Sequence, residues 1–331
     1  MPAEWENPSR ILLTLPAAHT DWGDILPEAL DQYRRLIEAL VAGVESLLLI
    51  AESLPQEIAD IIAGADVKVL DIPYNDTWTR DYGPITVEEQ DKLLELDFGF
   101  NGWGLKFAAD RDNLINLQLA EISENVYRNN RDFVLEGGSI ESDGRGLILT
   151  TSRCLCSPNR NGGKSRGELE SILAERLGAK KVLWLDHGFL EGDDTDSHVD
   201  TLARIAPDDT ILYVAPPEDS KDIHYEDLKK MEEQLRGFTT PEDKPLRLVA
   251  LPFPDPIYDE DGQRLPATYA NYLVTGSNLY LPTYSQEEKD RQAEEAVRKV
   301  FPHHRIFTID CRTLIRQHGS LHCSTIQLYN A

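Results

Sequence analysis

The sequence predicts an α/β protein built from five similar units arranged in a ring, with strands and a helix in each unit. Three observations support this prediction. Short apolar strands followed by polar motifs recur along the chain, hairpin-like strand pairs follow four of these motifs, and helical segments separate the units. An ordinary open α/β sheet with the same alternation of strands and helices remains the alternative.

A short run of Val, Ile and Leu residues begins each predicted unit. Such runs, about four to eight residues long and bounded by turn-forming residues, are typical of strands. The predicted leading strands are VKVLDIP near residue 67, FVLEGG near 133, KVLWLDHG near 181, LRLVALPFP near 246 and RIFTIDC near 305.

A second pair of strands follows four of the leading strands. These pairs are ITVEEQDKLLEL, IESDGRGLILTT, TLARIAPDDTILYVA and NYLVTGSNLYLP. The turn centres Asp143-Gly144, Asp208-Asp209 and Gly276-Ser277 suit tight hairpins. Apolar residues at helical spacing predict helices over about 110–128, 165–178, 221–236 and 285–300.

The fifth unit ends with LHCSTIQLY and has no strand to complete its hairpin. The N-terminal strand RILLTLP and a helix near 27–43 could supply the missing part. We therefore expect the N-terminal segment to close the ring, which would bring the polar motifs together near its axis. The most apolar helical run, ALVAGVESLLLIA (39–51), contains Glu45 and is too short to span a membrane.

The chain of 331 residues carries 58 acidic and 33 basic residues, a net charge of −25. This balance argues against nucleic acid and anionic membranes as partners, because both require a basic surface. It fits a cationic substrate, although an acidic surface is more often a feature that keeps a protein soluble. Four cysteines and no signal peptide predict a cytoplasmic protein with reduced thiols.

Four polar clusters occupy equivalent places in the units: WTRDYGP, EGG, DSHVD and HCS. Their chemical groups are Asp81, Glu136, His198, Asp200 and Cys323. His198 and Asp200 are two residues apart and would share one face if that segment were a strand. A thiol, an imidazole and carboxylates together indicate nucleophilic catalysis. The surplus carboxylates favour a cationic substrate, and a planar guanidinium matches carboxylates best.

Other types of site were weighed against this interpretation. The acidic stretch of Asp193, Asp194 and Asp196 with His198 and Asp200 could bind a metal. It lacks the spacing of an EF-hand and offers a single His, so we expect no metal there.

Several motifs resemble those of the agmatine deiminase and bacterial (Porphyromonas-type) peptidylarginine deiminase family. They extend nearly from end to end, as AEWENPSRILLTLP, TDW, WTRDYGP, FNGWG, EGGSI, NRN, TDSHVD, YAN and HCSTIQ. The resemblance implies the pentein fold, a five-bladed ββαβ propeller forming one catalytic domain over 1–331. It also implies hydrolysis of a guanidinium to a ureido group and ammonia, with no metal or organic cofactor.

The resemblance assigns roles by position. Cys323 would be the nucleophile and His198 the general acid and base, while Asp81 and Asp200 would hold the guanidinium. Glu136 would support His198 or the substrate nitrogens. Binding of the substrate is also implied for Asn271 of the YAN motif. Trp78 and Trp103 could line the alkyl chain of the substrate or simply pack in the core.

Three positions depart from the usual agmatine deiminase pattern: Glu141 replaces a His, Ser197 replaces a Gly, and HGSLHC replaces a glycine- and Asn-containing run. None is among the five chemical residues, so these departures bear on the substrate. Hydrolysis of agmatine in polyamine (putrescine) synthesis is the first hypothesis, and deimination of arginine in peptides is the alternative. An amidinotransferase, a guanidine-binding module without catalysis and a metal-dependent hydrolase are further classes. A homo-oligomer is compatible with the sequence.

Overall fold

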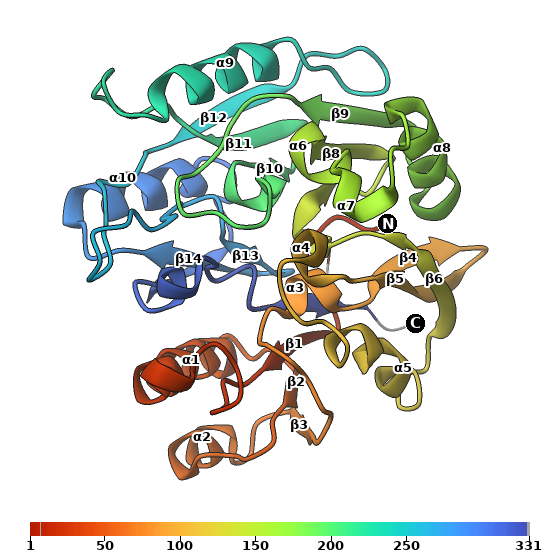
Figure 1. Cartoon of the computed structure of the whole chain (residues 1–331), viewed down its shortest axis with the longest axis vertical. Coiled ribbons are helices and arrows are strands. Elements are labelled where there is room, and N and C mark those ends of the chain that lie inside the picture. The colour runs from red at the N-terminus through yellow and green to blue at the C-terminus, as the bar shows by residue number, and fades with distance from the viewer. Residues whose placement is uncertain (7, 330–331) are drawn as a thin grey trace.

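The computed structural model describes residues 1–6 and 8–329 of the chain. Strands within these ranges form five small sheets, which lie around a common centre with the longer helices outside them (Figure 1). The two ends of the described chain meet, because the Tyr329 hydroxyl donates to the Ala3 carbonyl oxygen at 3.1 Å. This arrangement confirms the predicted α/β fold of five units.

Four of the sheets share one design of three strands. The first two strands form an antiparallel pair, and the third returns parallel to the second. The sheets are β4 (Ile85–Glu89), β5 (Lys92–Gly99) and β6 (Val126–Val134); β7 (Ile140–Ser142), β8 (Leu147–Thr151) and β9 (Lys181–Leu185); β10 (Ala203–Ala206), β11 (Thr210–Val214) and β12 (Arg247–Leu251); and β13 (Leu273–Val274), β14 (Asn278–Thr283) and β15 (Arg305–Asp310).

The fifth sheet joins the two ends of the chain. Its order is β16 (Ile326–Leu328), β1 (Arg10–Thr14), β2 (Leu47–Ile50) and β3 (Val67–Leu70). β16 pairs antiparallel with β1, and β1, β2 and β3 are parallel to one another. The prediction that the N-terminal strand completes the last unit is therefore confirmed.

The four long helices follow the predicted positions closely. They are α1 (Leu26–Ala42), α8 (Arg166–Leu177), α9 (Tyr225–Arg236) and α10 (Glu287–Arg298). Local chemistry fixes their ends: Pro27 lies in the first turn of α1, and Ser165 with Glu168 forms a capping box that begins α8. Each long helix buries apolar side chains along one face and leaves its charged residues exposed or partly exposed.

Short helical segments fill the connections. They are α2 (Gln56–Ile62), α3 (Thr79–Tyr82), α4 (Gly102–Leu105), α5 (Ile115–Leu119), α6 (Ser152–Leu155) and α7 (Pro158–Asn161), with the 3₁₀ turns η1 (Gly23–Ile25), η2 (Asp112–Leu114), η3 (Gly137–Ser139), η4 (Val199–Thr201) and η5 (Leu314–Gln317).

Two helix predictions are wrong in part. The helix expected over about 110–128 is reduced to η2 and α5, and β6 begins at Val126 because this segment pairs in parallel with β5. The helical run expected over 39–51 breaks at Gly43, and Leu47–Ile50 forms β2 instead. All four residues of β2 are buried between β1 and β3, which explains their uniformly apolar sequence.

Two clusters of buried apolar side chains form the core of the protein. A large apolar cluster connects the β1, β11 and β14 sheets, and a smaller one lies between the β5 and β8 sheets. Among the described residues, no helix combines the length and apolar character needed to cross a bilayer.

Candidate active site

Asp81 lies in α3, the short helix that follows β3, and is almost completely buried. Its Oδ1 accepts the backbone N–H of Gly138 at 2.9 Å, and its Oδ2 accepts the indole N–H of Trp103 at 2.8 Å. Burial raises the pKa of Asp81, and although His198 opposes this effect, the charge of Asp200 adds to it. Asp81 is thus held in one orientation by two donors from different units.

His198 lies between two carboxylates at the start of η4. Its Nδ1 is 3.5 Å from Asp81 Oδ1, and its Nε2 is 3.9 Å from Glu136 Oε2. Both ring nitrogens are buried, and neither has a hydrogen-bond partner among the described residues. Burial alone would lower the pKa of His198, but the surrounding negative charges, Asp81 first, raise it well above its usual value. These charges therefore favour the imidazolium form of the ring.

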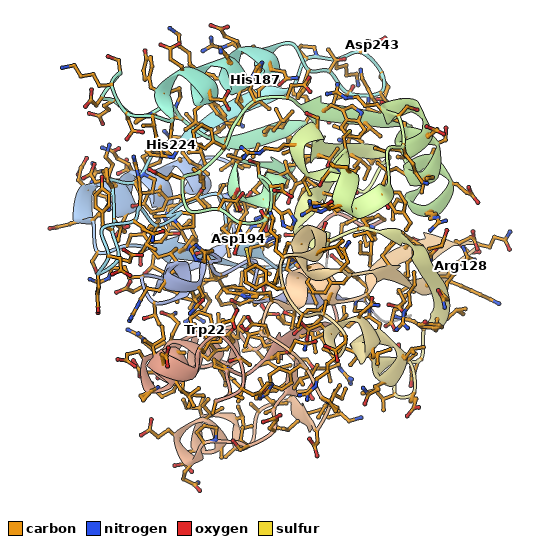
Figure 2. All side chains as sticks on the ribbon, viewed as in Figure 1. Trp22, Arg128, His187, Asp194, His224 and Asp243 are labelled. Carbon is orange, nitrogen blue, oxygen red and sulfur yellow. The ribbon has the colours of Figure 1, made fainter. Side chains whose placement is uncertain are left out.

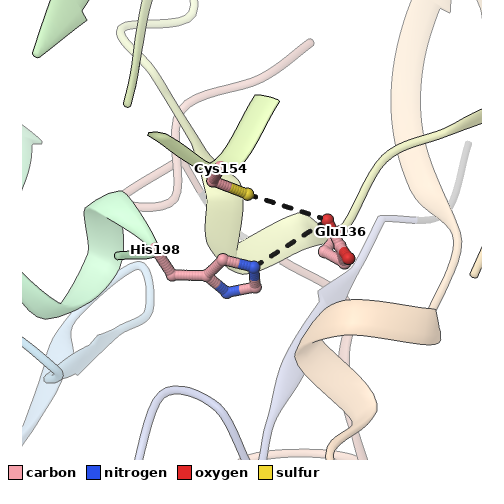
Figure 3. Close-up of side chains that lie close together, drawn as sticks. All are labelled: Glu136, Cys154 and His198. Atoms are coloured by element: carbon pink, nitrogen blue, oxygen red, sulfur yellow. Dashed lines mark hydrogen bonds and ion pairs between the residues drawn. The ribbon is translucent and has the colours of Figure 1, made fainter. Parts of the chain in front are cut away.

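Glu136 follows β6 and lies beside the His198 ring on its Nε2 side (Figure 3). Both of its oxygens accept from Arg160 Nε at 2.9 Å, and Cys154 Sγ lies 3.9 Å from Oε2 (Figure 3). Burial would raise the pKa of Glu136, but His198 and Arg160 hold it below its usual range. The carboxylate is thus ionised and committed to two cations.

The backbone before His198 has an unusual conformation. Asp196 and Ser197 have φ values of 65° and 64°, in the left-handed region that glycine adopts most easily. The Ser197 N–H donates to Asp193 Oδ2 at 2.6 Å, and Thr151 Oγ1 donates to the Ser197 carbonyl at 2.8 Å. These bonds hold Ser197 in a conformation that glycine adopts most easily. Asp200 then lies within η4, so this segment is a 3₁₀ turn and not a strand.

Asp200, Asn271 and Cys323 form the other half of the centre. Asn271 Nδ2 donates to Asp200 Oδ2 at 3.1 Å and lies 3.2 Å from Cys323 Sγ, while Sγ is 3.8 Å from Asp200 Oδ2. The Asn271 Oδ1 accepts the backbone N–H groups of His322 and Cys323. Asn271 thereby fixes the thiol relative to the carboxylate.

The pKa values of Asp200 and the Cys323 thiol are shifted in opposite directions. Burial would raise the pKa of Asp200, but the hydrogen bond and charge of His322 lower it. Burial raises the pKa of the Cys323 thiol well above its usual value, and the charges of Asp200 and Asp81 raise it further. In the free protein, Cys323 is therefore a neutral thiol beside ionised Asp200.

A cleft opens onto this centre. Asp81 and Cys323 lie on its buried side, together with the faces of Trp78 and Trp103. Less buried carboxylates line its other parts: Asp21, Asp76 and Asp194. Asp194 lies near the middle of the molecule in the view of Figure 2. The cleft is thus narrow, aromatic and acidic, as a site for an elongated cation requires.

The structure brings the predicted residues together. Asp81, His198, Glu136, Asp200, Cys323 and Asn271 surround one point, and Trp78 and Trp103 line the cleft. Sequence reasoning missed four neighbours that hold these groups in place: Glu4, Cys154, Arg160 and His322. Three of the four lie in motifs that were recognised, NRN, HCSTIQ and AEWENPSR, but nothing in the letters showed their partners.

Two carboxylates of the acidic stretch that was considered for a metal are bound to other protein groups. Asp193 accepts from Thr195 and Ser197, and Asp196 pairs with Lys106 and Arg160. Among the described residues, two donor groups are compact enough for an ion: Glu136 with Cys154 and His198, and Glu4 with Glu141 and His322. An arginine already contacts the carboxylates of each group, so a dication would meet positive charge there.

Gly138 provides a test of how tightly this centre is built. A Cβ at this position would lie 2.8 Å from both Asp81 Oδ1 and His198 Nδ1, and 3.1 Å from Asp200 Oδ2. We expect Gly138→Ala to lower kcat/KM by about 100-fold, because displacement of groups by about 1 Å has effects of that size. Steady-state kinetics with a guanidino substrate would measure it. Gly167→Ala, where a Cβ meets nothing within 4 Å, is the matched control; equal activity of the two variants would contradict the geometry.

Comparison with known proteins identifies the family to which this chain belongs. The Porphyromonas-type peptidyl-arginine deiminase family model matches residues 1–328. A Legionella pneumophila (strain Paris) protein assigned as an agmatine deiminase is 31% identical over 331 residues, which cover 99% of this chain and 94% of that protein.

Solved structures agree over the whole chain. The C. jejuni agmatine deiminase, a Cys-to-Ser variant with substrate bound, is 37% identical with a TM-score of 0.90, covering 100% of this chain and 96% of that one. The Enterococcus faecalis agmatine deiminase is 26% identical with a TM-score of 0.88, covering 100% and 95%. With a thiol, an imidazole and carboxylates at its centre, this chain belongs to the Porphyromonas-type peptidyl-arginine deiminase family, whose members hydrolyse guanidino groups.

Proposed function

We propose that this protein hydrolyses agmatine to N-carbamoylputrescine and ammonia, a step of polyamine (putrescine) synthesis. One observation carries the proposal: the cleft that ends at Cys323 and Asp81 is lined farther out by Asp21, Asp76 and Asp194. Agmatine is a dication with a guanidinium at one end and an ammonium at the other. An inner and an outer set of carboxylates match these two charges.

In this scheme the guanidinium lies between Asp81 and Asp200, and its alkyl chain passes Trp78 and Trp103. Asp200 Oδ1 is buried and has no partner among the described residues, so a substrate N–H group would satisfy it. Charge-assisted hydrogen bonds of this kind contribute roughly 1.5–3 kcal/mol each. They hold the carbon beside Cys323 Sγ, where it can be attacked.

The first half of the reaction forms a covalent thiouronium. Arrival of the substrate cation offsets the charges of Asp81 and Asp200, which lowers the pKa of the Cys323 thiol and releases its proton to solvent. The thiolate bonds to the guanidinium carbon, and one C–N bond breaks. The departing nitrogen takes a proton from the His198 imidazolium and leaves as ammonia.

The second half releases the product. His198, now neutral, takes a proton from water, and the water oxygen bonds to the thiouronium carbon. The C–S bond then breaks and the remaining hydroxyl proton passes to the departing sulfur, which gives the neutral ureido product and restores the Cys323 thiol. Glu136 lies behind the imidazole throughout, and Arg160 keeps that carboxylate in place.

Deimination of arginine in peptides is the competing function within the family. A peptide would present a backbone rather than an ammonium to the outer carboxylates. Ureido product should therefore be measured with agmatine, free arginine and a blocked arginine peptide in parallel. Turnover of agmatine alone supports the proposal. Turnover of the peptide alone would replace it with protein modification, and no turnover of any substrate would contradict both.

The outer carboxylates predict a pH dependence specific to the ammonium group. Burial is the main cause that raises the pKa of Asp76 to about 7 and that of Asp194 to about 6. Carboxylates are neutral below their pKa, so the attraction for the ammonium is present above pH 7 and lost as the pH falls through this range. We expect the ratio of kcat/KM for agmatine to that for butylguanidine to fall by roughly tenfold between pH 8 and pH 5.5.

Butylguanidine lacks only the ammonium, so changes at Cys323 and His198 cancel in this ratio. Asp76→Asn should lower the ratio at pH 8 and flatten its pH dependence. Asp24→Asn should leave the ratio unchanged, because Asp24 is exposed and does not line the cleft. A ratio that stays constant with pH in the wild-type protein would show that the outer carboxylates do not bind the ammonium.

A further inference from the structure

A chain of ionic contacts runs behind Asp200, on the side away from Cys323. The imidazole of His322 connects two carboxylates: its Nδ1 is 2.7 Å from Asp200 Oδ2, and its Nε2 is 2.7 Å from Glu4 Oε1. Glu4 comes from the N-terminal segment, and Asp200 lies in η4, so the contacts join distant parts of the chain. The imidazole of His322 is almost completely buried.

Two arginines complete this network. Arg80 Nη1 lies 2.8 Å from Glu4 Oε1, and Arg204 Nη2 lies 2.5 Å from Glu4 Oε2. The Nε of Arg204 binds Glu141 Oε1, and its Nη2 also lies 3.0 Å from His322 Nε2. The network thus contains three carboxylates and, if the imidazole is protonated, three cations.

The contacts of His322 fix its orientation. An ionised carboxylate can only accept hydrogen bonds, so Nδ1, which lies 2.7 Å from Asp200 Oδ2, is the donor to that carboxylate. Nε2 lies 2.7 Å from Glu4 Oε1 and 3.0 Å from Arg204 Nη2. Arg80 and Arg204 also pair with Glu4, so its buried charge has cationic partners besides His322.

The network determines which oxygen of Asp200 is free. His322 and Asn271 both bind Oδ2, while Oδ1 is buried and has no partner among the described residues. Rotation of the carboxylate would break both bonds to Oδ2. The side chain is therefore fixed with one oxygen engaged by protein and the other available to a ligand.

We propose that His322 and Glu4 are positioning residues that hold Asp200 ionised and oriented for the substrate guanidinium. The proposal rests on the proposed deiminase function. His322 acts directly on Asp200, and Glu4 acts through His322 by holding the ring at Nε2, so that Nδ1 points at Asp200. Glu141 takes part through its contact with Arg204 Nε.

Two substitutions of His322 separate this role from a general packing role. The amide nitrogen of Asn can replace Nδ1 as the donor to Asp200, whereas that of Gln reaches the position of Nε2 and leaves Asp200 without its donor. We expect His322→Gln to lower kcat/KM by about 10–100-fold relative to wild type. The kcat/KM of His322→Asn should be about tenfold higher than that of His322→Gln. Glu4→Gln should lower kcat/KM about tenfold. Glu6→Gln, at an exposed residue nearby in the sequence, should have the kcat/KM of wild type.

A second measurement does not depend on turnover. Chloroacetamidine and chloroacetamide alkylate thiols and differ mainly in charge, so the ratio of their rates at Cys323 reports how well Asp200 attracts an amidinium. This ratio, measured by mass spectrometry of the Cys323 peptide, should fall about tenfold in His322→Gln and much less in His322→Asn.

The outcomes separate the two proposals. If wild type hydrolyses no guanidino substrate, the proposed function fails, and the alkylation ratio alone decides whether His322 positions Asp200. If wild type hydrolyses agmatine but the two His322 variants share one activity and one alkylation ratio, the positioning role is wrong. Thermal melting of every variant shows whether a shared loss comes from unfolding, in which case Glu4→Gln carries the comparison with Glu6→Gln.

Discussion

Replacement of Cys323 by alanine should abolish hydrolysis of the guanidino substrate while leaving the fold intact. We expect kcat to fall by at least about 10⁴-fold, because removal of a covalent nucleophile eliminates the pathway rather than weakening it. The thiol is small and is held mainly by Asn271, so its loss creates little empty space. Steady-state detection of ureido product with agmatine measures the effect.

A matched cysteine shows whether the effect is specific. Cys156 is partly exposed and lies outside the cleft, so Cys156→Ala should retain wild-type activity. Intact-mass analysis adds a direct test, since wild type mixed rapidly with agmatine should carry an adduct equal to substrate minus ammonia, and Cys323→Ala should not. Turnover by Cys323→Ala would place the nucleophile elsewhere, with Cys154 beside His198 the next residue to examine.

Much of the fold could be predicted because the same local pattern repeats. Each hairpin shows its turn residues, and β16 at the end of the chain lacks a partner that β1 can provide. The errors arose where one sequence pattern is compatible with both a helix and a strand. The run Leu47–Ile50 is uniformly apolar, and only its burial between two parallel strands distinguishes a strand from a helix.

For the candidate site, the sequence predicted the chemical residues but not the neighbours that shift their pKa values. Asp81, His198 and Cys323 carry distinctive chemistry within recognisable motifs, so their convergence could be expected. The groups that tune them could not be read in the same way. Asp81 and Asp200 look alike in sequence, yet His322 lowers the pKa of one while burial raises that of the other. Such differences depend on contacts between units distant in sequence.

Substitution of His198 by glutamine should lower kcat by about 10²–10⁴-fold, the usual contribution of a positioned acid or base. Gln keeps a polar side chain near Glu136 and Asp81 but cannot deliver a proton to the departing nitrogen. His187→Gln is the matched control, because His187 is partly exposed and lies outside the cleft. Activity of His198→Gln near that of wild type would assign the proton transfers to another group.

The pH profile identifies what His198 does beyond holding its neighbours. The carboxylates around it raise its pKa well above its usual value, so the imidazolium that protonates ammonia persists at neutral pH and is lost only at alkaline pH. Wild-type kcat should therefore fall on an alkaline limb as His198 loses its proton, and this limb should be absent from the residual activity of His198→Gln. A limb that persists in the variant would belong to another titrating group. Its disappearance, together with the loss in kcat, would assign the general acid to His198, because a purely structural role would lower the profile without changing its shape.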